Sequence, residues 1–289
     1  MTLQAQALLN WQFPVVEQEV DERSAILYAL GIGLGADPTD PRQLRFLYEN
    51  GLEVFPTMGL VLGHPGPWYR DPRTGIDWVA VLHGEQELVV HGQLAPRDKV
   101  TCHTRVTGVV DKGPGRGALV YWEREVTRTG TGEPLFTLSS TLVCRNDGGF
   151  GGPSTSTRPP IPRGSGEPDV EVDLPVSSRA GLIYRLSGDL NPLHVDPAVA
   201  RQAGFERPIL HGLCTFAVAV HAILRGCLDY RTDQIGHVRA RFSAPFLPGE
   251  TLRTQIWRGD DGFTFRCLSV ERDRVVIDAG HLRTREEPR

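Results

Sequence analysis

One stretch with almost nothing apolar to bury constrains this chain more than any other feature. It reads GGFGGPSTSTRPPIPRGSGEPD, from Gly148 to Asp169, and is dominated by glycine, proline and serine, as linkers are. It divides the 289 residues into two parts of about equal length, and each part is long enough to build a core. We therefore expect an N-terminal unit over 1–147, a linker over 148–169 and a C-terminal unit over 170–289.

The two parts echo each other in order, which indicates an internal duplication. The segment that starts at Tyr28, YALGIG, has a counterpart in YRLSGD, which starts at Tyr184. Each part ends in three runs with the alternating pattern and the valine, threonine and phenylalanine content of strands. These runs are Lys99 to Val110, Ala118 to Thr127 and Leu135 to Arg145, then Thr251 to Arg258, Phe263 to Glu271 and Val275 to Thr284.

One helix is expected ahead of the second set of strands, from Gly212 to Cys227. Leu213, Phe216, Val220 and Leu224 fall at helical spacing on one face, and the neighbouring face is apolar as well, so the helix should be enclosed. The strands come in runs and do not alternate with helices, which favours an α+β fold over a parallel α/β fold. The sequence therefore predicts an antiparallel sheet wrapped around a central helix, present twice.

Charge, hydropathy and cysteine usage exclude several classes. A net charge of -4 argues against non-specific binding of nucleic acid, which needs a basic surface. No run approaches the roughly 20 apolar residues that span a bilayer, and the N-terminus lacks the pattern of a signal peptide. Five scattered cysteines without a CxxC pair indicate buried thiols in a reducing compartment. We expect a cytoplasmic protein without a metal or a separate cofactor.

The segment with recognisable chemistry is YRLSGDLNPLHVDP, from Tyr184 to Pro197. Asp189, Asn191 and His194 lie within six residues, next to a glycine and a proline that forbid a regular helix. We therefore expect a shaped turn on which these side chains converge. A carboxylate and an imidazole in reach of each other form an acid–base pair that can hold a water molecule, and the carboxylate should fix the tautomer of the imidazole.

The start of the expected helix supplies the second chemical element. The first backbone N–H groups of a helix have no partner within it, and the helix dipole favours negative charge there. At Gly212 the missing side chain lets a ligand carbonyl approach closely. This arrangement predicts an oxyanion hole for an enolate that forms on a thioester oxygen.

Less specific interpretations compete with this one. An Asp-x-Asn-x-x-His pattern is about as often plain turn chemistry, because Asn and Asp favour turns. His194, Asp196 and His211 suggest a metal site, but their spacing matches no common ligand set. The start of the Asp189 segment also resembles a calcium loop, whose later glycine and glutamate are missing. His211 and His221 are interpreted as structural histidines.

The run YRLSGDLNPLHVDP, followed by GFERPILHGLC from Gly204, closely resembles the signature of the MaoC-like, or type 2, enoyl-CoA hydratases. The resemblance extends to the first part through YALGIGLGADP, LYE, VLHGEQ, DKG and GGFGG, and so covers nearly the whole chain. It implies a double hot-dog fold like the hydratase unit of peroxisomal multifunctional enzymes. It also implies reversible hydration of trans-2-enoyl-CoA to (3R)-3-hydroxyacyl-CoA, with acyl-CoA as the partner molecule.

The resemblance also assigns roles by position. Asp189 and His194 become the catalytic pair, Asn191 orders the water, and the amide of Gly212 binds the thioester oxygen. The positions that contact the CoA ester in the family are His83, Gly84, Lys112 and Phe242. Glu49 matches a position important for the integrity of the protein. In the proposed step His194 takes a proton from water and Asp189 protonates C2, or the two roles are exchanged or shared.

The first part lacks this chemistry, because it has GIGLGAD where the second has GDLNPLH. One active site per chain follows, and the degenerate part is expected to make room for a longer acyl tail. Three functions remain as alternatives: a hot-dog acyl-CoA thioesterase, a dehydratase of a branched or dicarboxylic acyl-CoA, and a non-catalytic acyl-CoA-binding protein. A chain with two such units fits either a monomer or a homodimer.

Overall fold

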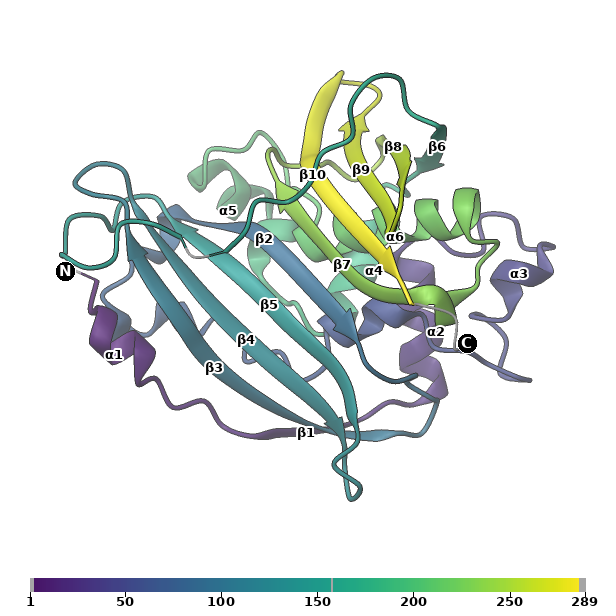
Figure 1. The fold of residues 1–289 in the computed structure, drawn as a ribbon, viewed down its shortest axis with the longest axis horizontal. Helices are drawn as coiled ribbons and strands as arrows, with labels where there is room; N and C mark the ends of the chain where they lie inside the picture. The colour runs from purple at the N-terminus through teal and green to yellow at the C-terminus, as the bar shows by residue number, and fades with distance from the viewer. Residues whose placement is uncertain (1–2, 157, 286–289) are drawn as a thin grey trace.

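The computed structural model describes residues 3–156 and 158–285, and all ten of its strands join in one antiparallel sheet. The order across the sheet is β1-β3-β4-β5-β2-β7-β10-β9-β8-β6, so the two parts meet where β2 pairs with β7 (Figure 1). The strands are β1 (Val16–Glu19), β2 (Val81–Val90), β3 (Lys99–Asp111), β4 (Ala118–Arg128), β5 (Pro134–Cys144), β6 (Val170–Pro175), β7 (Ile235–Phe242), β8 (Thr251–Gly259), β9 (Gly262–Ser269) and β10 (Arg274–Thr284).

The six strands expected from the sequence are all present, with ends that differ by no more than two residues. Their alternation reflects a sheet with one face on the core, since successive side chains point to opposite faces. The four further strands were not predicted from the sequence, because β1 and β6 are short edge strands and the apolar pattern of β2 and β7 is interrupted by charged residues. Those charges lie at the seam between the halves, where Arg239 of β7 pairs with Glu85 of β2 at 2.6 Å.

The helices are short except for the one that the sequence predicts. They are α1 (Ala5–Leu9), α2 (Glu22–Gly31), α3 (Pro41–Leu44), α4 (Ala180–Tyr184), α5 (Pro197–Gln202) and α6 (Gly212–Cys227), with 3₁₀ turns η1 (Pro56–Leu60), η2 (Trp68–Arg70), η3 (Pro72–Thr74), η4 (Trp78–Ala80), η5 (Arg185–Ser187), η6 (Pro192–His194) and η7 (Thr232–Gln234). Among the described residues no helix has the length and apolar character needed to cross a bilayer.

Helix α6 is the core of the C-terminal half. Every residue from Leu213 to Leu224 is buried, as expected for a helix that is apolar nearly all round. It packs against β6 and β8 on the inner face of the sheet. The N-terminal half differs at the corresponding place, because its segment forms only the 3₁₀ turn η1. Pro56 opens this turn, and Gly59 approaches the ring of Phe136 so closely that a Cβ there would lie 2.9 Å from it.

The internal repeat is visible in the packing. Tyr28 of α2 and Tyr184 of α4, which the sequence aligns, are both fully buried, and their ring centroids lie 5.7 Å apart. Helices α2 and α4 contact each other. The two related segments therefore meet in the interior between the halves, as in a pair of hot-dog units.

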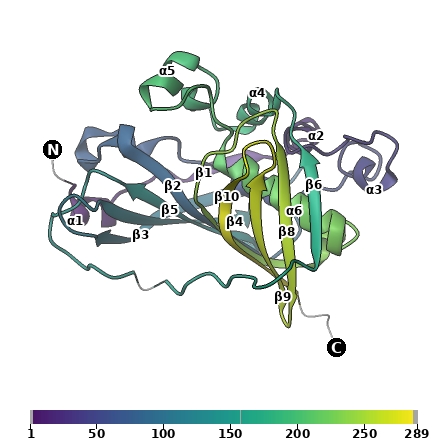
Figure 2. The same cartoon turned by 90° about the horizontal axis from the view of Figure 1, so that it is seen from above.

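The glycine- and proline-rich linker runs along the face of the sheet opposite the helices (Figure 2). It is held there at several points. Arg239 donates to the carbonyl of Pro159 at 2.8 Å, the indole of Trp257 donates to that of Gly166 at 3.2 Å, and Ile161 is buried. At its start, the carboxylate of Asp111 accepts the amides of Gly149 and Gly151, each at 2.7 Å. The low apolar content of the segment predicted a linker, and hydrogen bonds hold this segment against the sheet.

Candidate active site

The sequence around Asp189 folds into a turn that presents its polar side chains. Gly188 has φ +124°, in the region that favours glycine, and it turns the chain after η5. Asn191 caps η6, since its Oδ1 accepts the amide of Leu193 at 3.2 Å, and Pro192 occupies the first position of that turn. The result places Asp189 and His194 on the same side of the loop. The amide of Asn191 also donates to Oδ1 of Asp189 at 3.2 Å.

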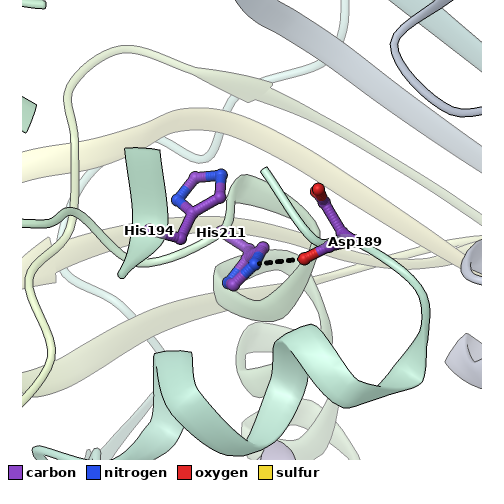
Figure 3. Close-up of side chains that lie close together, drawn as sticks. All are labelled: Asp189, His194 and His211. Atoms are coloured by element: carbon purple, nitrogen blue, oxygen red, sulfur yellow. Dashed lines mark hydrogen bonds between the residues drawn. The ribbon is translucent and has the colours of Figure 1, made fainter. Parts of the chain in front are cut away.

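The acid–base pair that the sequence predicts, Asp189 and His194, is joined at this point by a third side chain, His211 (Figure 3). The carboxylate of Asp189 and the imidazoles of His194 and His211 offer atoms that all lie within 4.8 Å of one another. The rings of His194 and His211 stack, with centroids 3.8 Å apart. No direct hydrogen bond joins Asp189 to His194 within the described chain. The spacing therefore suits a water molecule held between them.

Backbone carbonyls hold both imidazoles in place. Nδ1 of His194 lies 2.9 Å from the carbonyl oxygen of Ile209, so it carries the proton and leaves Nε2 free to accept one. The prediction that the Asp189 carboxylate would fix this tautomer is wrong, because a main-chain carbonyl does so. His211 donates from Nε2 to the carbonyl oxygen of Asp189 at 3.1 Å, and so supports the loop that carries Asp189.

Burial sets the charge states of these groups. It lowers the pKa of His194 against the opposing effects of Asp189 and Ile209, and it lowers the pKa of His211 to about 3, with the neighbouring His194 adding to the effect. For Asp189 burial favours the neutral acid, but His211, His194 and the amide of Asn191 outweigh it, and the pKa lies below its ordinary value. At neutral pH the loop therefore carries a carboxylate beside neutral imidazoles.

Helix α6 begins at Gly212, as predicted, and His211 is its N-cap residue. No side chain caps the helix, so its first amides are available to a ligand. A Cβ at Gly212 would lie 3.5 Å from the ring of Phe242, so glycine leaves a narrow space between this ring and the first amide of α6. The amide predicted to bind a carbonyl thus stands next to the loop that carries Asp189 and His194.

The residues expected to contact CoA divide into two groups. His83 and Phe242 meet at the seam between the halves, with ring centroids 5.0 Å apart, and Phe242 borders Gly212. Gly84 lies beside them at a bulge in β2, where a Cβ would lie 2.6 Å from Val143. Lys112 is exposed on the turn after β3, where its backbone N–H donates to the carbonyl of Gly117 at 3.0 Å. No contact links Lys112 to the other three residues.

The N-terminal half contributes residues that the sequence did not reveal. Arg70 of η2 donates from Nη2 to Oδ1 of Asn191 at 3.2 Å and lies over the ring of Trp78 at 4.4 Å. Burial lowers the pKa of His64 to about 4, and His64 lies close enough to Asp189 for the carboxylate to oppose this shift. Both residues come from the irregular segment between η1 and β2, which carries no periodic pattern or motif.

Other sequence-based assignments have plainer outcomes. His221 is buried in α6, where Nε2 lies 3.0 Å from the hydroxyl of Tyr230, consistent with a structural histidine. Glu49 is exposed just after α3. Asp196 caps α5 by accepting the amide of Ala198 at 2.7 Å, so it is not part of the cluster. Asp189, His194 and His211 have a spacing that could hold a metal ion, but one nitrogen of each imidazole is engaged by a carbonyl.

Comparison with known proteins assigns each half of the chain to a related family model. The model of the MFE-2 hydratase 2 N-terminal domain matches residues 18–146, and that of the MaoC like domain matches residues 163–279. Enoyl-CoA hydratase ChsH3 of Mycobacterium tuberculosis is 36% identical over 288 residues, covering 97% of this chain and 98% of its own. The peroxisomal multifunctional enzyme type 2 of Drosophila melanogaster is 35% identical, over 91% of this chain and 45% of its own.

Solved structures show the same architecture. The MaoC-like dehydratase of Phytophthora capsici superimposes with a TM-score of 0.85 at 29% identity, over 98% of this chain and 99% of its own. A further Mycobacterium tuberculosis protein described as a double hot-dog fold matches with a TM-score of 0.57 at 14% identity, which concerns the fold alone. The double hot-dog fold expected from the sequence is confirmed.

Proposed function

The chain belongs to the MaoC-like hydratases, in the form with two hot-dog halves, and on that premise we propose that it adds water reversibly to trans-2-enoyl-CoA to give (3R)-3-hydroxyacyl-CoA. It is a hydro-lyase. The observation that supports this reaction most directly is the geometry at the start of α6. A carboxylate oxygen of Asp189 and an imidazole nitrogen of His194 lie within 4.8 Å of each other, beside the uncapped amides of the helix. The R configuration rests on the resemblance to R-specific members of the family.

The amide of Gly212 receives the thioester oxygen. Its N–H and the dipole of α6 stabilise the negative charge that develops on this oxygen when C3 is attacked, and this makes C3 electrophilic. An oxyanion hole of this kind typically contributes about 10²–10³ in rate for each donor. Because the ring of Phe242 lies next to Gly212, the planar enoyl group is held between this ring and the catalytic loop.

Water supplies both groups that are added, the hydroxyl at C3 and the proton at C2. One O–H bond of the water breaks as its oxygen bonds to C3, and Nε2 of the neutral His194 takes the proton. The enolate then takes a proton at C2 from the same acid–base pair. Because Asp189 is ionised at rest, it can donate only a proton that came from the water, so the pair acts as a relay with no net change. This refines the assignment of Asp189 as the acid.

Asn191 and Arg70 complete the arrangement. The side-chain oxygen of Asn191 is engaged by Leu193 and Arg70, which leaves its NH₂ group to donate to the water. His83, Gly84 and Phe242 form the path of the pantetheine arm at the seam. Lys112 is exposed on its turn and meets a CoA phosphate as a mobile point charge.

The acyl tail extends into the N-terminal half. There the central helix is reduced to η1, and the loop that corresponds to 188–194 has no Asn or His, so one active site serves each chain. A degenerate half of this kind offers room where a second helix would otherwise fill the sheet.

The test is direct. Purified protein is mixed with trans-2-enoyl-CoAs of increasing chain length, the loss of enoyl-thioester absorbance is followed, and the product is resolved by chiral chromatography. We expect turnover to the 3R product without release of free thiol. Release of CoA thiol would indicate a thioesterase, binding without turnover would indicate a carrier, and either result contradicts the proposal.

We also propose a reducing compartment, the cytoplasm, as the location of the protein. All five cysteines are free and four are buried. Imaging of a fluorescent fusion would contradict this proposal if it marked another compartment. Sedimentation of the purified chain would decide between a monomer and a homodimer.

A further inference from the structure

A buried arginine in the N-terminal half lacks the counter-ion that its position demands. Arg124 of β4 is 2% exposed. Its Nη2 donates to the carbonyl of Leu60 at 2.6 Å and its guanidinium lies 5.7 Å from the ring of Trp122. Within the described residues, Nε and Nη1 have no hydrogen-bond partner, and no carboxylate pairs with the side chain. Two of the three nitrogens of the guanidinium, with three N–H bonds between them, are therefore left without a partner in the described residues.

The other arginine that is buried in this sheet shows what a satisfied charge requires. Arg239 is 8% exposed, and it pairs with Glu85 at 2.6 Å and with the carbonyl of Pro159 at 2.8 Å. A buried charge is stable only when it is paired and hydrogen-bonded. Burial lowers the pKa of Arg124 to about 10 against a small opposing effect of Cys102, so its surroundings support the cation poorly. A bound anion would correct this deficit.

Arg124 lies in a polar interval on the inner face of the sheet. Val126, on one side of it along β4, belongs to the main core around α6, while Trp122, on the other side, belongs to the smaller cluster around Trp68. The interval holds further polar groups: the indole Nε1 of Trp122 has no partner among the described residues, and Ser140 donates to Gln86 at 2.7 Å. Two apolar clusters are thus separated by a band of donors and acceptors.

This band adjoins the catalytic loop. The residue after Leu60, whose carbonyl Arg124 binds, is Val61, and its carbonyl lies 3.7 Å from where a Cβ of Gly188 would be. Further along the same segment, the ring of His64 meets Trp122 edge to face at 5.8 Å. The segment 60–64 therefore connects the turn that carries Asp189 to the guanidinium of Arg124. Arg124 and Asp189 both affect the pKa of His64, so the arginine lies near the loop that carries Asp189, and an acyl chain that extends into the N-terminal half as proposed above would pass close to it.

We propose that Arg124 binds a carboxylate carried on the acyl group, so that the preferred substrate is the CoA thioester of a dicarboxylic or carboxylated enoic acid. This inference rests on the hydratase function proposed above. A carboxylate suits the site better than a neutral oxygen, because it accepts a charge-assisted hydrogen bond from Nη1 or from Nε, which point to opposite sides of the guanidinium, and also neutralises the charge.

The first experiment needs no mutation. Wild-type protein is assayed on sets of three trans-2-enoyl-CoAs of equal chain length that end in methyl, hydroxymethyl or carboxylate. We expect kcat/KM for the carboxylate at its optimal length to exceed that for the methyl analogue by about 10- to 100-fold, the worth of a charge-assisted hydrogen bond. Equal rates for the three, or a hydroxymethyl substrate as good as the carboxylate, overturn the inference.

The second experiment assigns the preference to the residue. Arg124→Met replaces the alkyl stem of the side chain and its apolar contacts but removes the guanidinium and its charge, and we expect it to lose the preference while hydrating the methyl analogue at the wild-type rate or faster. Arg105→Met, on the exposed side of the adjacent strand where it pairs with Glu123, is the matched control and should keep the preference. Thermal unfolding of both variants checks that the fold survives.

The two levels of argument fail differently. If wild-type protein hydrates no enoyl-CoA of any kind, the proposed function fails. If it hydrates methyl-terminated substrates and discriminates against the carboxylate, only the role of Arg124 fails. If Arg124→Met does not fold, the substrate preference of the wild-type protein still supports or overturns the inference.

Discussion

The Nδ1–H of His194 donates to the carbonyl oxygen of Ile209, with 2.9 Å between nitrogen and oxygen, and Ile209 lies in the segment that leads into α6. This one bond connects the two elements proposed for catalysis, because Ile209, which fixes the tautomer of His194, lies three positions before Gly212, whose amide is the proposed oxyanion donor. A shift of either element would therefore misalign the other.

The pH dependence follows from the charge state of His194. Its imidazole must be neutral to accept a proton, and burial lowers its pKa, so the active form persists to lower pH than it would for an exposed histidine. We expect the acid limb of kcat/KM to have its midpoint below the ordinary value of about 6.5. A pH–rate profile measures this, and a midpoint at or above that value would contradict the assignment of His194 as the base.

Removal of either member of the pair should abolish most of the activity. His194→Ala removes the acceptor and Asp189→Asn removes the carboxylate with little change of shape, and we expect each to lower kcat by about 10²–10⁴-fold. His221→Ala is the control, because His221 is a buried histidine of α6 that binds Tyr230 and lies outside the loop of Asp189 and His194, and the folded variant should keep its activity. Near-normal turnover of His194→Ala or Asp189→Asn would exclude that residue from the mechanism.

His211 should behave as a positioning residue. In His211→Phe the ring can still stack on His194, but the bond to the carbonyl of Asp189 is lost. We expect kcat to fall about 10-fold, the scale of one hydrogen bond, with KM almost unchanged. Because burial keeps His211 neutral, the midpoint of the pH–rate profile should not move. A loss as large as that of His194→Ala would instead indicate direct proton transfer by His211.

Much of the fold could be predicted because its signals are local. The ends of α6 are marked by Gly212 and by the end of the apolar run, and the strands of the C-terminal half alternate cleanly. The Asp189 loop was recognisable for the same reason, since Gly188, Asn191 and Pro192 each serve a local backbone need. These residues specify their own conformation without help from distant parts of the chain.

What the sequence could not predict depends on tertiary contacts. Arg70 and His64 lie in an irregular segment, more than a hundred positions before the loop that they meet, and nothing local distinguishes them from other polar residues. The lone charge of Arg124 is likewise invisible, because β4 has charged residues on both sides of it and only the fold decides which face is covered. The tautomer of His194 also depended on a carbonyl fifteen positions away.

Removal of metal ions should leave the activity intact. Asp189, His194 and His211 could bind a divalent cation by their spacing, but the proposed chemistry uses Nε2 of His194 as a proton acceptor, which a metal would occupy. We expect kcat/KM to be unchanged after exhaustive treatment with a chelator, and added Zn²⁺ to inhibit. Activity that is lost on chelation and restored by one metal would show that the prediction of a metal-free site is wrong.

The amide of Gly212 can be tested by a substitution that removes almost nothing else. Gly212 is the first residue of α6, a position that favours proline, and His211 before it has φ -57° and ψ 133°, the conformation that a residue before proline prefers. Gly212→Pro should therefore fold but lack the N–H, while Gly212→Ala adds a similar bulk near Phe242 and keeps the N–H. We expect the alanine variant to retain most of its kcat and the proline variant to lose about 10²–10³-fold. If both variants lose the same activity, steric exclusion by the added carbon explains the loss, and the oxyanion hole must be formed by another donor.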